Sequence, residues 1–275
     1  MKSNTASSFT EALPPIHQNH KYLLSIIIPT FNSSQTIKRC LNSILGMNNK
    51  HYIQVVIIDN CSQDSTLELI RSLSSADINL SIYSEPDRGI SDAFNKGIER
   101  SDADFILLLG SDDFIISKNV DFICEAYLSA SLQGFFDILF TGIIDLDTGK
   151  SHFTWLDKIT KRNSFIHPGT IISSVAYQKY GLYSLGFPVG MDYEFFCRAY
   201  KDQARYANIY LPTIMHSSAG ISSNKVKCFI DSFRVRQRHF KAHLPLFELI
   251  NYTPSILRSS FNSFLRYFRH GSDHF

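Results

Sequence analysis

Three uncharged apolar runs, each followed at once by a cluster of polar residues, constrain the fold of this chain most. Runs of this length are typical of strands buried on both faces, as in a parallel sheet. The carboxyl ends of such strands form the edge at which open α/β sheets bind ligands. We therefore expect the clusters to form one site. The runs are 25–28, 55–58 and 105–109, and the clusters are 29–32, 59–64 and 110–113.

The same succession of strand and helix continues through the first half of the chain. Ser33 or Ser34 is suited to cap the first helix. Strands alternating with helices form right-handed βαβ units. The predicted fold is therefore an α/β three-layer sandwich with a mostly parallel central sheet. The predicted strands are 23–28, 53–59, 80–83 and 105–109, and the predicted helices are 34–45, 65–73, 91–100 and 119–128.

The pattern becomes less regular after residue 135. Short strands are predicted at 136–144, 152–155, 171–173 and 205–210, with helices at 174–180 and 191–200. Beyond residue 224 the chain is predicted to be helical, with breaks at Pro245 and Pro254. We expect three parts: a flexible leader at 1–20, one α/β domain at 21–224, and a basic, aromatic helical tail at 225–275.

Charge is distributed unevenly along the 275 residues. The segment 225–275 holds nine Lys and Arg against three Asp and Glu, whereas residues 1–224 hold 18 against 22. A basic, aromatic segment of this kind favours contact with an anionic membrane surface, while a homo-oligomer interface and a solvated helix face remain alternatives. No nucleic-acid-binding motif accompanies the charge, so nucleic acid is not an expected partner.

Five scattered cysteines without a CxxC pair indicate reduced thiols rather than a zinc site or a disulfide framework. Neither a signal peptide nor an apolar run long enough to span a bilayer is apparent. We therefore expect a cytoplasmic protein, peripheral at the inner face of the cytoplasmic membrane.

The polar clusters belong to four longer segments: SIIIPTFN at 25–32, IDNCSQDST at 58–66, EPDRGISDAFNKGI at 85–98 and LGSDD at 109–113. In this order they resemble the family 2 inverting glycosyltransferases, and the resemblance covers roughly residues 22–220. It implies the GT-A fold and a metal-dependent, hexosyl-type transferase. Such an enzyme moves a sugar from a nucleotide-diphosphate donor, with a UDP-sugar favoured, to a hydroxyl of a saccharide or lipid-linked saccharide, as in surface polysaccharide or O-antigen synthesis.

The resemblance assigns the first three segments to the nucleotide sugar. Asp59 follows an apolar run, where its carboxylate suits a base N–H, and the forked guanidinium of Arg88 suits a diphosphate. Asp92 and Asn95 share a helix face that the family turns toward the donor. Helix capping by Asp64 or Asp92 is the alternative, as is solvent exposure of Arg88 and Asn95. The predicted donor-binding set is Pro29, Thr30, Phe31, Asn32, Asp59, Asp64, Glu85, Arg88, Asp92, Asn95 and Ser111.

The segment LGSDD departs from the Asp-x-Asp pattern of the family, because Gly110 stands at the first Asp position. Asp112 and Asp113 remain, and Mg²⁺ typically binds through one or two carboxylates together with substrate phosphates. The resemblance therefore implies Mn²⁺ or Mg²⁺ held by Asp112 and Asp113, with His216 as a further candidate ligand. A turn that happens to contain two acids is the alternative.

The segment 191–198 resembles the acidic motif in which an Asp serves as the catalytic base of the family. Asp192 matches that Asp, while Met191 stands where Glu is often found. Otherwise, an acid at a helix start is simply favourable with the helix dipole. The segment 167–170 resembles an acceptor-side segment that contains a His, here His167.

Two other classes of protein stay open at this point. A nucleotidyltransferase would normally carry a glycine-rich loop with a basic residue after the first strand, and residues 29–35 contain no Gly, Lys or Arg. A non-catalytic nucleotide-sugar-binding module is harder to exclude, because Gly110 and Met191 both depart from the family pattern. A Rossmann oxidoreductase would need GxGxxG after the first strand, and the sequence has none.

Overall fold

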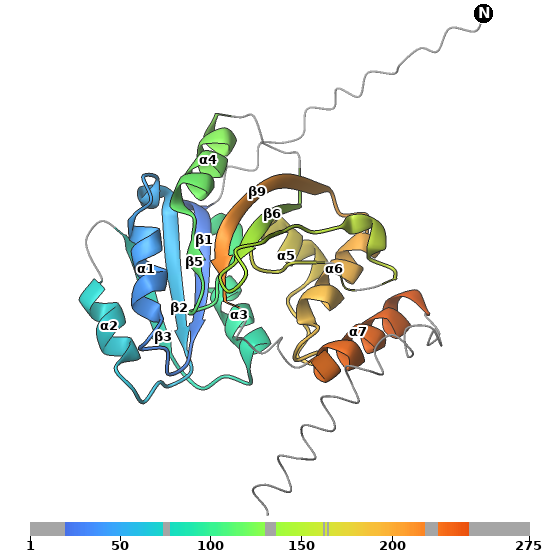
Figure 1. Cartoon of the computed structure of the whole chain (residues 1–275), viewed down its shortest axis with the longest axis horizontal. Helices are drawn as coiled ribbons and strands as arrows, with labels where there is room; N and C mark the ends of the chain where they lie inside the picture. The colour runs from blue at the N-terminus through green and yellow to red at the C-terminus, as the bar shows by residue number, and fades with distance from the viewer. Residues whose placement is uncertain are drawn as a thin grey trace, which may run out of the picture.

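A computed structural model of the chain describes residues 20–73, 78–129, 136–161, 163, 165–217 and 225–241. Its centre is a nine-stranded sheet with the order β3-β2-β1-β4-β8-β6-β9-β5, and β7 pairs with β6 (Figure 1). The strands are β1 (Tyr22–Thr30), β2 (Ile53–Asp59), β3 (Asn79–Ser84), β4 (Ala103–Leu108), β5 (Phe114–Ile115), β6 (Ile138–Asp145), β7 (Ser151–His152), β8 (Thr170–Ser173) and β9 (Tyr206–His216). The helices are α1 (Ile37–Leu45), α2 (Thr66–Leu73), α3 (Ile90–Glu99), α4 (Ser117–Leu128), α5 (Ser174–Tyr180), α6 (Met191–Lys201) and α7 (Lys225–Phe240).

The first half of the sheet is parallel and brings the expected strand ends together. β3, β2, β1 and β4 are neighbours that all run in the same direction. The register places Thr30 opposite Asp59, and Asp59 opposite Ser84. β2 is buried throughout and β1 nearly so, as their continuous apolar runs predicted. The polar clusters that follow these strands therefore lie at one edge.

The second half of the sheet is mixed and curls over the first, as Figure 1 shows. β8 is antiparallel to β4 and β6, while β9 runs parallel to β6 and antiparallel to β5. The sequence pattern did not predict β5, and β9 is longer than the predicted strand 205–210. Because Phe114 pairs with Met215, β9 carries His216 to the turn that follows β4.

Helices cover both faces of the sheet, and each face has its own apolar core. α1, α2 and α4 pack on one face around residues such as Ile44 and Ile70, whereas α3, α5, α6 and α7 pack on the other around residues such as Phe94 and Phe196. This arrangement, a mostly parallel α/β sheet between two helical layers, confirms the fold class predicted from the sequence.

The predicted cap of the first helix is wrong. α1 begins at Ile37, and Thr36 occupies its N-cap without a side-chain hydrogen bond. Ser33 and Ser34 take part in the preceding loop instead, since Ser33 Oγ lies 2.9 Å from Ser111 Oγ and Ser34 N donates to Asp64 at 3.2 Å. These contacts with distant segments replace local capping.

α7, the first part of the predicted tail, packs against α6, and its Val235 is fully buried. This helix is therefore continuous with the core of the domain. The predicted leader, apart from residue 20, and the tail beyond residue 241 lie outside the described residues. Within the described residues, no helix has both the length and the apolar character needed to cross a membrane.

Candidate active site

A groove of about 610 Å³ opens at the carboxyl ends of the parallel strands. One wall comes from the loop after β1, and the rest from the segments that follow β2, β3 and β4. The predicted donor residues that line this groove are Pro29, Thr30, Phe31, Asn32, Asp64 and Ser111, together with Asp112 of the predicted metal pair. These residues from the polar clusters after separate strands therefore lie together at one groove, and their role in donor binding stays a prediction.

Hydrogen bonds between distant segments hold the loop after β1 in place. Asn32 adopts a left-handed backbone conformation with φ of 47°, and its N–H donates to Ser62 Oγ at 2.9 Å. In return, Gln63 N donates to Asn32 Oδ1 at 2.9 Å. Because this loop is fixed from both sides, Phe31, which is 58% exposed, is held at the groove.

Asp59 lies beneath the groove rather than in its wall. Its side chain is fully buried and accepts hydrogen bonds from Thr30 Oγ1 at 3.1 Å, Ser84 Oγ at 2.7 Å, and both the N and Oγ of Ser62 at 3.0 and 2.5 Å. A buried carboxylate needs such donors to offset the loss of water. Asp59 therefore fastens three segments of the sheet edge together, while its neighbour Asn60 lines the groove.

Asp64 combines the two roles that the sequence left open. It lines the groove, and its Oδ1 accepts from Thr66 N at 3.0 Å and Thr66 Oγ1 at 2.5 Å at the start of α2. Its Oδ2 accepts from Ser34 N at 3.2 Å. These hydrogen bonds, chiefly that from Thr66, lower the pKa of Asp64 to about 2, so the carboxylate is charged at neutral pH.

The other predicted donor ligands after β3 do not line the groove, which differs from the prediction. Arg88 points to solvent with 75% of its side chain exposed and pairs with Asp92 at 3.0 Å. Glu85 pairs with Lys96 and Arg100 instead.

Asn95 likewise departs from the predicted donor face. It donates to Tyr183 O and accepts from Tyr183 N, both at 2.9 Å. α3 is therefore tied by this side chain to the segment that leads into α6. The same segment carries the predicted base.

Two carboxylates converge on the space above Gly110. A Cβ added to this glycine would lie 2.8 Å from Asp112 Oδ1 and 2.9 Å from Asp113 Oδ2. The missing side chain thus leaves a small recess between two acidic oxygens. Oxygen donors of this kind suit Mg²⁺ or Mn²⁺, with donor phosphates completing the coordination. Within the described residues, no group of three or more potential ligands has the arrangement of a ready metal site.

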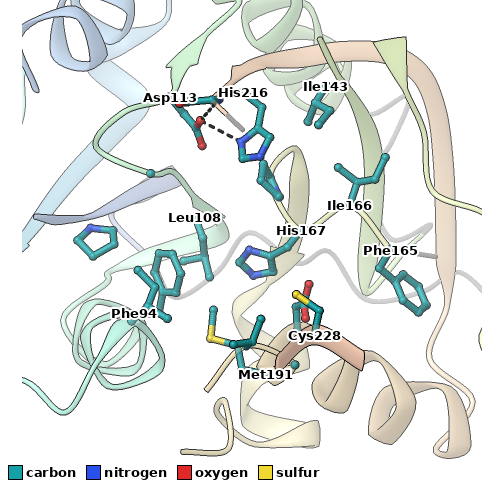
Figure 2. A pocket seen from close by; sticks show the side chains of 18 of the residues that line it. Phe94, Leu108, Asp113, Ile143, Phe165, Ile166, His167, Met191, His216 and Cys228 are labelled. Atoms are coloured by element: carbon teal, nitrogen blue, oxygen red, sulfur yellow. Dashed lines mark hydrogen bonds and ion pairs between the residues drawn. The ribbon is translucent and has the colours of Figure 1, made fainter. Parts of the chain in front are cut away.

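His216 lies against one of these acids, as Figure 2 shows. Its Nδ1 is 3.0 Å from Asp113 Oδ1, which also accepts from Ser217 N at 2.8 Å. The hydrogen bond to Asp113 raises the pKa of His216, in spite of partial burial. His216 and Asp113 therefore form a fixed pair, and the third predicted metal residue is brought to the other two.

A second cavity, of about 470 Å³, adjoins the groove and shares Pro29, Ile90, Ser111 and Asp112 with it. Its walls are mainly apolar, and Figure 2 shows side chains of α3, β4, β6 and the segment before β8 pointing inward. The apolar lining includes Phe94, Leu108, Ile143, Phe165, Ile166 and Met191, and the ionisable lining is Asp112, Asp113, His167, Asp192, His216 and Cys228.

Asp192 stands in the first turn of α6 at the wall of this cavity. Its Oδ1 accepts from Tyr193 N at 2.6 Å. Burial raises the pKa of Asp192 to about 6, because removing water disfavours the charged form. A carboxylate with such a pKa is suited to take a proton near neutral pH.

His167 is another polar side chain in the wall of this cavity. Burial lowers its pKa to about 4, so its imidazole is neutral at pH 7. Its Nε2 lies 3.1 Å from Tyr183 Oη, which in turn lies 2.9 Å from Tyr177 Oη. This buried chain fixes the orientation of the ring.

The cavity also contains residues that the sequence did not indicate. Cys228 and Ser232 belong to α7, and both line the wall near the start of α6. No motif marks them, because they reach the site only through the packing of α7 on α6. The basic, aromatic pattern of this segment predicted a membrane contact or an oligomer interface, and not a contribution to the cavity.

Residues 25–123 match the family model for Glycosyl transferase family 2. The chain is 25% identical over 196 residues to a PGL/p-HBAD biosynthesis glycosyltransferase of Mycobacterium bovis, with 68% of this chain and 74% of that protein covered. The family model covers all four segments that carry the resemblance, so the resemblance of these segments to family 2 glycosyltransferases is confirmed.

Two solved structures have the same fold. The mannosyltransferase PcManGT from Pyrobaculum calidifontis, in complex with GDP-Man and Mn²⁺, superposes with a TM-score of 0.63 and 13% identity, covering 95% of this chain and 79% of that chain. S. aureus TarS 1–349, in complex with UDP-GlcNAc, superposes with a TM-score of 0.60 and 19% identity, covering 72% of this chain and 59% of that chain. The fold of the chain is therefore GT-A-like.

Proposed function

We propose that this glycosyltransferase moves a sugar, with inversion, from a nucleotide-diphosphate donor to a hydroxyl of a saccharide or lipid-linked saccharide. One observation carries the proposal: Asp112 lies where the groove and the cavity meet, and Asp192 lies in the wall of the same cavity. A donor in the groove and an acceptor in the cavity would meet at this junction.

The assignment of a nucleotide sugar to the groove rests on its residues and on its relatives. Hydroxyl, amide and backbone groups of Thr30, Asn32 and Ser111 line it, as a sugar nucleotide requires. Two proteins of the same fold bind UDP-GlcNAc and GDP-Man. We favour a UDP-sugar donor and assign the relevant pathway to surface polysaccharide or O-antigen synthesis, with a relative in PGL/p-HBAD biosynthesis as support.

In the proposed reaction Asp192 takes the proton of the acceptor hydroxyl as that oxygen attacks the anomeric carbon. The bond between the anomeric carbon and the diphosphate oxygen breaks at the same time, and the diphosphate leaves through the groove. Attack from the side opposite the leaving group inverts the configuration. Holding both substrates in this geometry supplies much of the rate enhancement.

Asp112 and Asp113 would hold Mn²⁺ or Mg²⁺ at the recess above Gly110, with His216 beside them. When bound, such a cation acts as a Lewis acid that stabilises negative charge on a leaving diphosphate. PcManGT, which has the same fold, binds Mn²⁺ with its donor.

The test of the proposal is the substitution Asp192→Asn, which keeps the shape of the side chain and removes its basicity. We expect nucleotide release from a panel of UDP-, GDP- and dTDP-sugars with acceptor to fall by about a hundredfold or more, consistent with loss of a general base. Donor binding, measured by calorimetry, should be unchanged because the groove is intact.

Asp202→Asn provides the matched control, since this exposed acid follows the other end of α6. Turnover by Asp192→Asn equal to that of the control would remove Asp192 from the mechanism. A wild-type protein that binds a sugar nucleotide but never releases product, with Mn²⁺ or with EDTA, would support the non-catalytic module instead.

We also propose that the segment from residue 225 brings the enzyme to the anionic inner face of the cytoplasmic membrane. One side of α7 meets α6 and the acceptor cavity, while Arg234, Arg238 and Lys241 are exposed. A membrane on that side would present a lipid-linked acceptor close to the cavity. Self-association through the same face is the alternative.

A further inference from the structure

The start of α6 is held by a residue from another helix. Asp231 of α7 accepts hydrogen bonds through its Oδ2 from Val189 N at 3.0 Å and Gly190 N at 3.2 Å. Its Oδ1 accepts from Arg234 at 3.2 Å, and the side chain is only 5% exposed. These contacts join residues that are about forty positions apart in the chain.

Backbone N–H groups at a helix start have no partner within the helix and require a cap. Gly190 occupies the N-cap of α6 and offers no side chain for this purpose. The carboxylate of Asp231 instead binds the backbone at Val189 and Gly190, just before the helix. Its negative charge is also favourable at the positive end of the helix dipole.

The packing leaves little freedom at this point. A Cβ added to Gly190 would lie 2.9 Å from Asp231 Cβ, so only glycine permits this approach of the two segments. Further along, His239 Nε2 lies 3.1 Å from Glu194 Oε1, and Val235 is fully buried between these contacts. α7 is thus anchored to α6 on both sides of Val235.

Asp192 lies two residues after Gly190, in the first turn of α6, so its position depends on how the start of this helix is held. We propose that Asp231 is a positioning residue for the reaction, which fixes the backbone at Val189 and Gly190 so that Asp192 faces the acceptor. This inference rests on the proposed role of Asp192. Asp231 itself is not a catalytic residue, because it acts through the start of α6.

The experiment compares Asp231→Ala and Asp231→Asn in the full-length protein, with Gln237→Ala as the control from an exposed position on the same helix. We expect Asp231→Ala to lower kcat for transfer by about tenfold to a hundredfold, since misplacement by about 1 Å has effects of this size. The donor KM should stay within about twofold of wild type, because the donor groove contains no residue of α6 or α7.

Asp231→Asn keeps one carbonyl acceptor, so it should restore part of the lost kcat. If Asp231→Ala only reduced the amount of folded protein, the apparent kcat would fall because fewer molecules are active. Titration of the active sites with donor measures the active fraction, so kcat can be corrected for this loss. If the alanine variant does not fold, the asparagine variant decides the test alone, with an expected loss in kcat of several-fold.

The proposal is overturned if kcat of every folded Asp231 variant stays within about twofold of Gln237→Ala, or if donor KM rises in step with the loss of kcat. The result for Asp192→Asn separates the two hypotheses. Full activity of that variant refutes the proposed base, whereas an inactive Asp192→Asn beside a fully active Asp231→Ala refutes the positioning role only.

Discussion

At the scale of single residues, two acids that look alike in sequence have opposite surroundings. Asp59 follows an apolar strand and is enclosed by four hydrogen-bond donors. Asp192 opens a helix at the wall of a mainly apolar cavity, and its Oδ1 accepts a hydrogen bond from the adjacent Tyr193 N. Hydrogen-bond donors surround the first carboxylate, whereas burial raises the pKa of the second to about 6. The second acid is therefore suited to accept a proton near neutral pH.

The pH dependence of transfer follows from the raised pKa of Asp192. The carboxylate must be charged to act as a base, so the rate should rise with pH and level off above about 6. Below that value kcat should fall about tenfold for each pH unit. Measuring kcat from about pH 4.5 to 8 at saturating donor tests this dependence.

The other titratable groups around Asp192 do not account for a rise of kcat with pH near 6. His167 has a pKa of about 4, and burial raises the pKa of Tyr183 and of the cysteines far from this range. The hydrogen bond to Asp113 raises the pKa of His216 above its usual value of 6.5. Tyr183, Cys197 and Cys228 lie close enough to Asp192 for its charge to affect their pKa values, and His167 lines the same cavity. A rate that stays constant between about pH 5 and 7 would contradict this assignment of the base.

Residue types alone could not separate donor ligands from structural contacts. Thr30, Asn32 and Ser111 line the groove because they follow strands that end at the same edge. Arg88 and Asn95 also follow such a strand, yet they pair with Asp92 and with the backbone of Tyr183. The partner of Asn95 lies 88 residues away, and no local pattern reveals it.

At the scale of elements, helix α3 packs very closely against strand β1 of the sheet. A Cβ added to Gly97 would overlap Cγ2 of Ile27, a fully buried residue of β1. Helix and strand approach so closely only because this glycine has no side chain. The N-terminal end of the same helix contributes Ile90 to both the groove and the cavity.

Gly97→Ala should therefore destabilise the domain by about 1–3 kcal/mol, as expected for overpacking of a core. Urea denaturation followed by circular dichroism measures the change. Gly186→Ala is the control, because a Cβ there meets only Ser184 Oγ at 3.6 Å. Equal midpoints for the two variants would show that α3 can shift away from β1 without cost.

Strands could be predicted where the sequence contains a continuous apolar run. The apolar runs of β1, β2 and β4 indicated a parallel sheet, because strands buried on both faces are typically apolar without alternation. β5 has two residues and exists only through its pairing with β9. The length of β9 likewise depends on that pairing and on β6, so its reach to His216 was not visible in the sequence.

At the scale of the whole molecule, the uneven charge has a defined place in the fold. α7 lines the proposed acceptor cavity with Cys228 and Ser232, and its Arg234 and Arg238 are exposed. Each basic residue near an anionic surface contributes about 1 kcal/mol to membrane binding. The position of α7 thus links the charge of this segment to the acceptor side of the enzyme.

Replacing Arg238 and Lys241 together by Gln should weaken binding to vesicles that contain anionic lipid by about twenty-fivefold, or about fivefold for each charge. Co-sedimentation with vesicles measures the affinity, and transfer to a water-soluble acceptor should persist. The matched control replaces the exposed Lys38 and Arg71, which lie on α1 and α2. An equal loss for both pairs would indicate nonspecific attraction, and unchanged binding with altered oligomeric mass would favour self-association.

The two recesses draw on different stretches of the chain. Every residue of the groove precedes residue 113, whereas the cavity takes most of its lining from residue 143 onward. With the donor in the groove and the acceptor in the cavity, as proposed, recognition of the two substrates would be encoded almost separately and would meet at Asp112. Chimeric enzymes joined just after the fourth strand are a direct way to redesign which glycoside is made.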